Sequence, residues 1–241
     1  PSVEDKERLH QFISDIIGLI TWNLSAKRSL EKNNDTLILE EINKESDRWD
    51  RFLFNILSIT YNSGTIASIR ENLDCKTVES VNYAYELIDM IIDDSIKVKI
   101  FSLLDVVPDD EKLKNLNQFY PVEIPQYIKL LDDIINRDYN LLSLWTKACV
   151  LRYLSGLSDD EITESVVALL FSPEGILQEE AARLIGRSNR ELYRSVYHRI
   201  PATVRKHLFK IVNGETDEKE FLFEKTQFLS EYYLREHYQY V

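Results

Sequence analysis

The clearest chemical pattern in the sequence is a run of basic side chains in the last third of the chain. Residues 183–210 contain eight Lys or Arg residues and one acid, Glu191, although the whole chain has a formal net charge of −12. Guanidinium groups bind carboxylates and phosphates through paired N–H donors. We therefore expect a candidate site for an acidic partner, a phosphate group or an anionic membrane surface. Its members are Arg183, Arg187, Arg190, Arg194, Arg199, Arg205, Lys206 and Lys210.

The same basic run is also compatible with purely internal pairing. Arg183 and Arg187 are one helical turn apart, as are Arg190 and Arg194, so each pair is expected to share a helix face. Acidic residues flank the run on both sides and could form ion pairs with it between neighbouring helices. The sequence leaves both interpretations open. The flanking acids are Asp159, Asp160, Glu161, Glu164, Glu174, Glu179 and Glu180 before the run, and Glu215, Asp217, Glu218 and Glu220 after it.

No other group of reactive residues forms a recognisable catalytic or metal-binding motif. The six glycines are isolated, which excludes a glycine-rich phosphate loop. Adjacent acids such as Asp93 and Asp94 fall near expected helix ends, where they complement the helix dipole. Cys75 and Cys149 are predicted to be small, largely buried residues in a reducing compartment. We expect no catalytic activity, no cofactor and no metal, since the histidines lack partners at ligand spacing: His10, His198, His207 and His237.

The composition favours a helical protein with a substantial core. Apolar residues make up 44% of the chain, while Gly and Pro number six each, too few for the turns of a β-rich protein. The negative net charge disfavours general nucleic-acid binding. No uninterrupted apolar run reaches the roughly 18 residues of a membrane span, and no signal peptide is visible, so we expect a cytoplasmic location. The start at Pro1 is compatible with removal of an initiator methionine or with excision from a longer protein.

Apolar residues follow the helical period along nearly the whole chain, which predicts antiparallel helices joined by short loops. Two long helices are expected first, the second capped by Asp35. Pro121 and Pro125 predict an extended seam, because proline fixes its own φ angle and biases the residue before it away from helix. We therefore divide the chain into residues 1–120 and 121–241. Capping boxes are expected at Ser158/Glu161, Ser188/Glu191 and Asp217/Glu220, and C-terminal helix caps at Gly156, Gly186 and Gly214.

Two segments, residues 137–151 and 172–186, resemble HEAT repeats. Each has a polar turn, then a charged residue before a pair of small residues, then an apolar close. A longer stretch, carried by residues 84–89, 103–105 and 145–151, is similar to the HEAT-like cytoplasmic region of bacterial membrane proteins related to ATP:ADP translocases. The resemblance covers roughly the middle half of the chain. It implies an all-α, right-handed, armadillo-like α-solenoid of about 12–13 antiparallel helices.

The expected function is a non-enzymatic helical-repeat scaffold or regulatory module that binds a protein or another macromolecule. One alternative is the soluble cytoplasmic domain of a nucleotide-transporter-like membrane protein, in contact with its membrane part at the inner membrane. A second alternative is an enzyme on a HEAT stack, such as a DNA glycosylase, which the acidic composition disfavours. The aromatic C-terminus is predicted to pack as a terminal cap or to form a docking surface: Phe221, Phe223, Phe228, Tyr232, Tyr233, Tyr238 and Tyr240.

Overall fold

The structure, a computed structural model, describes residues 3–138, 140–154, 164–216 and 221–227. The described residues form twelve α-helices, one 3-10 turn and a further short helical segment at 222–227, and no strand occurs among them. The prediction of an all-α fold with about 12–13 helices is therefore confirmed for the described residues. The chain divides into two compact units, residues 1–127 and residues 128–241.

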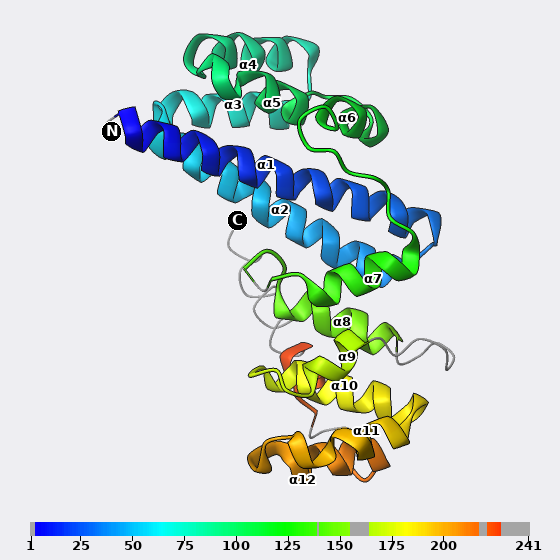
Figure 1. Cartoon of the computed structure of the whole chain (residues 1–241). Coiled ribbons are helices and arrows are strands. Elements are labelled where there is room, and N and C mark those ends of the chain that lie inside the picture. Colours follow the sequence, from blue (N-terminus) through cyan, green and yellow to red (C-terminus); the bar gives the residue numbers. More distant parts are fainter. Residues whose placement is uncertain (1–2, 139, 155–163, 217–220, 228–241) are drawn as a thin grey trace. The chain divides into compact units, whose positions relative to one another are not determined.

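Unit 1 begins with two long helices that lie side by side, α1 (Val3–Lys32) and α2 (Thr36–Thr60) (Figure 1). Both long helices were predicted. The expected cap of α2 is also confirmed, because the Asp35 carboxylate accepts a hydrogen bond from the backbone N–H of Ile38. Such a cap satisfies one of the N–H groups that a helix start leaves without an intrahelical acceptor.

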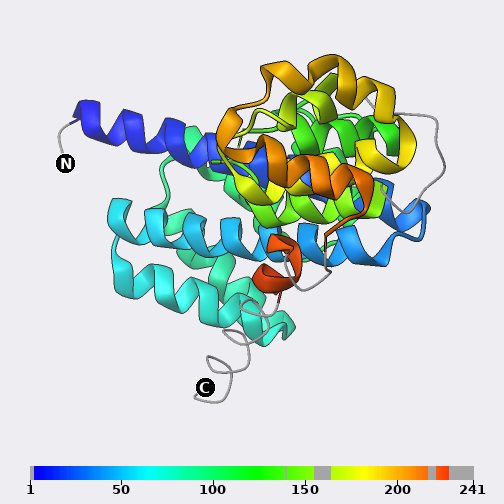
Figure 2. The same cartoon turned by 90° about the horizontal axis from the view of Figure 1, so that it is seen from below.

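Four shorter helices complete unit 1: α3 (Ser63–Cys75), α4 (Val78–Ile91), α5 (Asp94–Leu104) and α6 (Asp109–Leu116). Helix α3 packs on α2 (Figure 2), with α4 beyond it, while α5 and α6 pack on α1 (Figure 1). One apolar cluster joins these helices, because each presents residues at helical spacing toward it. Its buried members are Ile13, Ile16, Ile17, Ile20, Leu53, Leu57, Ile66, Ile69, Ala84, Ile88, Ile92, Ile96, Ile100, Leu103 and Leu116.

The predicted proline seam is an extended segment over residues 121–126, and α1 holds it in place. The Ser25 hydroxyl donates to the carbonyl oxygen of Glu123 at 3.0 Å, and the Ser29 hydroxyl donates to that of Pro125 at 2.8 Å. Both serines are buried on α1, and these bonds explain how hydroxyl groups can lie there without an energetic penalty. The boundary between the two units follows this segment.

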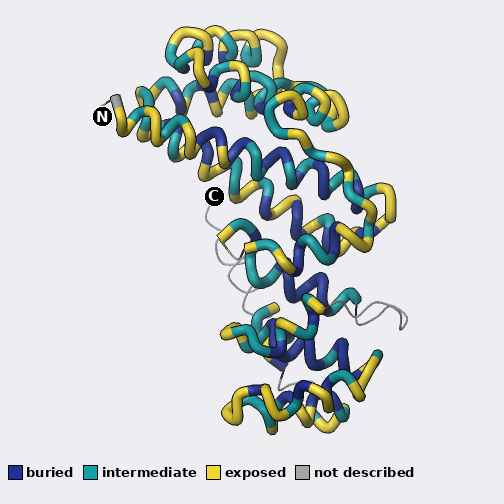
Figure 3. Tube along the Cα trace, in the orientation of Figure 1, coloured by how far each residue is buried: buried dark blue, intermediate teal, exposed yellow. Residues whose placement is uncertain are grey.

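Unit 2 contains α7 (Tyr127–Asn136) from residue 128 onward, followed by α8 (Leu144–Leu154), α9 (Glu164–Leu169), α10 (Gly175–Ser188), α11 (Arg190–Val196), the 3-10 turn η1 (Tyr197–Arg199) and α12 (Ala202–Asn213). Residues 222–227 are also helical. Helix α10 is the centre of the unit, because it packs against both α8 and α12, its second neighbours along the chain. Consistent with that position, α8 and α10 are buried along most of their length (Figure 3).

Several predicted helix ends are wrong. Gly186 is not a C-terminal cap: α10 continues to Ser188, and a Cβ at position 186 would lie 2.7 Å from the Val212 backbone. This glycine therefore permits the close approach of α12. The predicted Ser188/Glu191 box is replaced by Asn189, whose side chain accepts from the Leu192 N–H.

Of the other predicted helix ends, one is confirmed and three lie outside the described residues. Gly214 caps α12 in the left-handed conformation, with φ +71°, as predicted. The boxes that begin at Ser158 and Asp217, and the cap at Gly156, lie outside the described residues.

Cys149 is buried as predicted, but Cys75 is exposed, so that prediction is wrong. Cys75 is the last residue of α3, and it is exposed there. Phe221 and Phe223 are buried, which confirms the predicted packing for these two aromatic residues. The aromatic residues from Phe228 onward lie outside the described residues. None of the helices in the described ranges has the length and apolar character needed to cross a bilayer.

Candidate functional site

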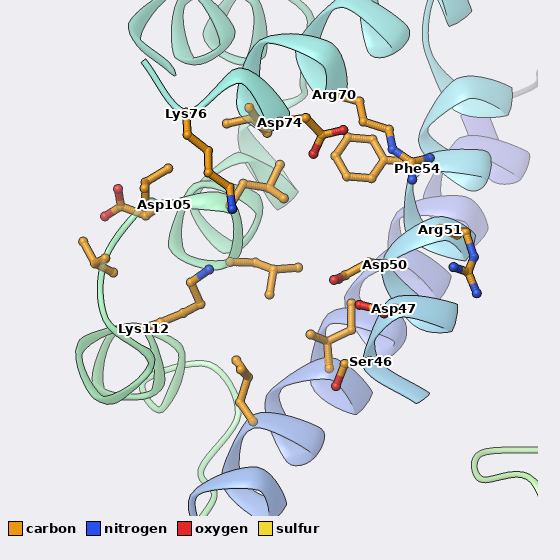
Figure 4. A pocket seen from close by; sticks show the side chains of 17 residues that line it. Ser46, Asp47, Asp50, Arg51, Phe54, Arg70, Asp74, Lys76, Asp105 and Lys112 are labelled. Carbon is orange, nitrogen blue, oxygen red and sulfur yellow. The ribbon is translucent and has the colours of Figure 1, made fainter. Parts of the chain in front are cut away.

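Unit 1 contains a cavity of about 490 Å³ between its helices (Figure 4). Such a volume is in the range of small-molecule sites. Helices α1, α2, α3, α5 and α6 supply its walls, which combine apolar and charged side chains. The apolar lining is Ile20, Leu24, Phe54, Leu73, Leu103, Leu104, Val106 and Val107, and the polar lining is Ser46, Asp47, Asp50, Arg51, Arg70, Asp74, Lys76, Asp105 and Lys112.

Three of the charged groups point into the cavity. The Lys76 and Lys112 ammonium groups enter from one side, and the Asp50 carboxyl group enters from the opposite wall (Figure 4). Asp105 points away and accepts a hydrogen bond from the Tyr85 hydroxyl at 2.8 Å, and Arg51 also points away. Within the part of the chain that the structure describes, the side chains of Asp50, Lys76 and Lys112 have no hydrogen-bond or ion-pair partner.

Burial in the cavity wall shifts the pKa of an acidic and of a basic side chain. Desolvation raises the pKa of Asp50 to about 6, even though Lys112 attracts the ionised form. Desolvation also lowers the pKa of Lys112, against the attraction of Asp109 and Asp50. The carboxyl group and the amine therefore both lie in a partly desolvated region, and each affects the pKa of the other without forming an ion pair. Perturbed groups of this kind concentrate at functional sites, because a ligand can supply the compensation that the fold does not.

Lys76 is unusual in its backbone as well as its side chain. It follows α3 as the C-terminal cap, with φ 56° and ψ 17°, the left-handed conformation that glycine adopts most readily. A residue with a Cβ is strained there by about 1 kcal/mol. The lysine at this position therefore lowers the stability of the fold, and its ammonium group lines the cavity.

The cavity is suited to holding a small molecule that carries one negative and one positive group. The two ammonium groups can bind a carboxylate or phosphate, while Asp50 can bind an ammonium group or donate as a neutral acid. The leucine and valine side chains can cover an apolar portion of the ligand.

Sequence reasoning did not identify this site. Asp50 lies on the polar side of an amphipathic helix, where an acid is ordinary, and Lys112 is separated from it by the whole of α3, α4 and α5. The one local signal was the lysine after α3 at a helix end, where glycine or asparagine is typical.

A second polar cluster, unanticipated from the sequence, joins α1 to the start of α5. The His10 imidazole contacts the Ser95 hydroxyl at 3.1 Å through Nδ1 and the Asp93 carboxylate at 3.1 Å through Nε2. The order serine, histidine, aspartate is that of a nucleophilic relay. However, Asp93 also accepts from Lys6 at 2.9 Å and from the Tyr61 hydroxyl at 2.9 Å, and these donors lower its pKa. In a relay, Asp93 would have to orient the His10 imidazole. Lys6 and Tyr61 already stabilise its negative charge, so we assign the cluster a structural role.

The predicted basic run lies on α10, α11, η1 and α12, and several of its arginines make contacts within unit 2. Arg183 lies beside Glu180, with Nε 3.6 Å from Oε1, and Arg194 pairs with Glu191. The Arg199 guanidinium lies over the Phe171 ring, 5.5 Å from its centroid.

Two other arginines of the run bind carbonyl groups at helix ends. Arg190 donates to the carbonyl oxygen of Gly186 at 3.0 Å, and Arg205 donates to that of Ile200 at 2.7 Å. Lys206 and Lys210 are exposed on α12, and Arg187 is exposed near the end of α10. Arg183 and Arg187 therefore do not share an exposed face. Anion binding by the run stays a prediction, while internal pairing accounts for part of it.

Neither family models, curated proteins nor solved structures gave a match to this chain. The resemblance to HEAT repeats and to translocase-related proteins therefore stays a prediction.

Proposed function

We propose that this chain is a non-enzymatic binding and regulatory module, and that unit 1 binds an amino-acid-like zwitterion in its cavity. The observation that carries the proposal is the set of three charged side chains, Asp50, Lys76 and Lys112, that face the cavity without partners in the described structure. Asp50 and Lys112 are half-buried and Lys76 is exposed at the rim. A ligand that pairs with partly desolvated charges gains affinity from each contact.

Each part of the ligand has a counterpart in the cavity. A carboxylate would bind between Lys76 and Lys112, and an ammonium group would bind Asp50 in its ionised form. An apolar side chain would pack against Leu73, Leu103 and the other apolar lining residues. Binding of this kind requires no chemical change of the ligand, which is consistent with a regulatory role.

The test compares leucine with its two singly charged analogues by isothermal titration calorimetry. Isopentylamine lacks the carboxylate and 4-methylpentanoate lacks the ammonium group. We expect leucine, or another apolar amino acid of a similar size, to bind at least about ten-fold more tightly than either analogue, because each charged contact is worth roughly 1.5–3 kcal/mol. Equal binding of all three compounds, or the absence of binding for a panel of apolar amino acids, would refute the proposal.

Variants of the cavity connect any binding to these side chains. Asp50→Asn and Lys112→Gln should each weaken binding by about ten-fold or more. Lys114→Gln is the matched control, because this lysine is on the same helix and exposed outside the cavity lining, and it should bind like the wild type. Mass spectrometry of the recovered ligand tests the non-enzymatic part: conversion of the ligand would require an enzyme instead.

We also propose that unit 2 is a short stack of helix pairs that binds a macromolecular partner. The packing of α10 against α8 on one side and α12 on the other supports this, since second neighbours pack together in the rows of an α-solenoid. Small residues support it further: Ala148 on α8 and Ala181 and Ala182 on α10 are fully buried, and Gly186 of α10 lies against Val212 of α12. An experimental structure of the chain tests this arrangement, because each helix pair of a solenoid is rotated in the same direction relative to the pair before it.

A further inference from the structure

Lys112 is an amine that faces the cavity of unit 1 while the acids around it are engaged elsewhere. It lies on α6 and is half-buried in the cavity wall. The Asp109 carboxylate pairs with Lys27 of α1 at 2.7 Å, and the Asp105 carboxylate accepts from the Tyr85 hydroxyl at 2.8 Å. Among the described residues, no carboxylate is therefore in direct contact with the Lys112 amine.

This environment favours the neutral form of the amine. Burial lowers the pKa of Lys112, and repulsion from Lys27 acts in the same direction, while attraction by Asp109, Asp50 and Asp105 opposes both. A neutral lysine amine has a free electron pair and can attack a carbonyl carbon, as lysines that form Schiff bases do. Lys114 follows on the same helix, but it is exposed and lies outside the cavity lining. Helix α6 thus carries its own reference lysine.

A carboxyl group that can donate a proton faces this amine. Asp50 enters the cavity from the wall opposite Lys112 (Figure 4). Desolvation raises the pKa of Asp50 to about 6, and Asp47 adds to this effect, whereas Lys112, Arg70 and Arg51 oppose it. Below that pH, Asp50 is mostly a neutral acid that can protonate a leaving oxygen. The two walls therefore hold the nucleophile and the acid that imine formation requires.

Lys76 provides a place for an anionic group beside these two residues. Its ammonium group enters from the same side as Lys112 and lies at the exposed rim of the cavity (Figure 4). A carboxylate bound to Lys76 would direct the carbonyl carbon next to it into the space between Lys112 and Asp50. The apolar lining, which includes Leu103 and Leu104, can cover a short hydrocarbon chain.

We infer that Lys112 is a covalent attachment site that forms a reversible imine with a 2-oxo acid. The neutral amine attacks the ketone carbon, and a proton moves from nitrogen to oxygen to give a carbinolamine. Asp50 then protonates the hydroxyl group, the C–O bond breaks, and water leaves as the C=N bond forms. The iminium proton returns to the Asp50 carboxylate. One water molecule is lost in all, and hydrolysis reverses the reaction.

The test treats the full chain with 4-methyl-2-oxopentanoate and sodium cyanoborohydride, which reduces an imine to a stable secondary amine. A protease that does not cut at lysine, followed by mass spectrometry, gives the labelling rate of each lysine. The label adds the mass of the oxo acid less one oxygen atom. We expect Lys112 to react at least about ten-fold faster than Lys114, because more of its amine is neutral and the cavity concentrates the ketone.

A competitor and one variant connect this labelling to the cavity. Excess 4-methylpentanoate has the carboxylate but no ketone, so it should slow labelling of Lys112 and leave Lys114 unchanged. Lys76→Gln should also slow labelling of Lys112, because the carboxylate loses its partner. The comparison of Lys112 with Lys114 is made within one wild-type chain, so it does not depend on the folding of any variant.

The pH dependence tests the part assigned to Asp50. The ratio of wild-type to Asp50→Asn labelling rates at Lys112 should be larger below pH about 6 than above it, because only the protonated carboxyl group donates. Taking this ratio at each pH removes the pH dependence of the reductant. A group that only supports the cavity wall would give a constant ratio, and that result would overturn the assignment of Asp50 as the acid.

Two outcomes would overturn the inference itself: equal labelling of Lys112 and Lys114, and faster labelling of Lys112 that excess 4-methylpentanoate does not slow. The inference uses the cavity of the proposed function but does not rest on the binding of a zwitterion. Labelling of Lys112 without binding of leucine would refute only the zwitterion proposal. Binding of leucine with equal labelling of the two lysines would refute only the imine.

Discussion

The Tyr127 hydroxyl donates a hydrogen bond to the Asp35 carboxylate over 2.6 Å, and the other carboxylate oxygen accepts from the Ile38 backbone N–H at 3.1 Å. One buried carboxylate thereby caps α2 and also fastens the end of the extended segment, 92 residues away in the chain. This link belongs to unit 1 and closes it at its last residue.

Replacing Asp35 by Ala should lower the free energy of unfolding by about 2–3 kcal/mol, because both the cap and the partner of a partly buried hydroxyl are lost. Tyr127→Phe should have a smaller effect of about 1 kcal/mol. Urea denaturation followed by circular dichroism measures both. Tyr83→Phe, at an exposed position on α4, is the control and should change little. An Asp35→Ala variant as stable as this control would contradict the assigned link.

Asp50→Asn should change how stability depends on pH. Because the pKa of Asp50 is raised in the folded state to about 6, its contribution to stability is fully present below the ordinary value of 3.8 and is lost as the pH rises through about 6. The variant should therefore gain stability over the wild type between pH about 4 and pH about 7, by roughly 1–3 kcal/mol at the upper end. Denaturation at a series of pH values measures the difference, and a difference that is constant with pH would count against the burial of this group.

Lys76→Gly should raise the stability of the fold and weaken ligand binding. Glycine relieves the left-handed strain at this position, so we expect a gain of about 1 kcal/mol in the free energy of unfolding. Binding of the zwitterion should weaken, because one ammonium group is removed from the cavity. Lys114→Gly in α6 is the matched control and should lose about 1 kcal/mol, the usual effect of glycine inside a helix. Weaker stability of Lys76→Gly would show that its side chain has a structural role instead.

Gly186→Ala should destabilise unit 2. The added Cβ would meet the Val212 Cα and carbonyl oxygen at 2.7 Å, and backbone atoms cannot rotate away as a side chain can. Separation of α10 from α12 should lower the free energy of unfolding by about 1–3 kcal/mol. Gly64→Ala in α3, where the nearest atom would be 3.4 Å away, is expected to be neutral or slightly stabilising. Thermal denaturation of the two variants compares them directly, and equal melting temperatures would contradict the close contact.

The local features of the fold were largely predictable from the sequence. Helical periodicity gave the all-α class and both long helices, Asp35 predicted the start of α2, and the prolines predicted the extended segment. These features depend on interactions within a few residues of each position. Gly186 shows where such reasoning ends, since a glycine near a helix end indicates a cap until the neighbouring helix is known to lie against it.

The candidate sites depended on the tertiary structure. Asp50, Lys76 and Lys112 come from three different helices or helix ends, and each alone is an ordinary surface residue. Likewise, Glu179 and Arg183 look like solvated charges until residues 221–227 cover them. The sequence by itself determined that the chain forms amphipathic helices with well-marked ends. Only the tertiary structure decided which charges are desolvated, because desolvation depends on segments that are distant in the chain and pack over a side chain.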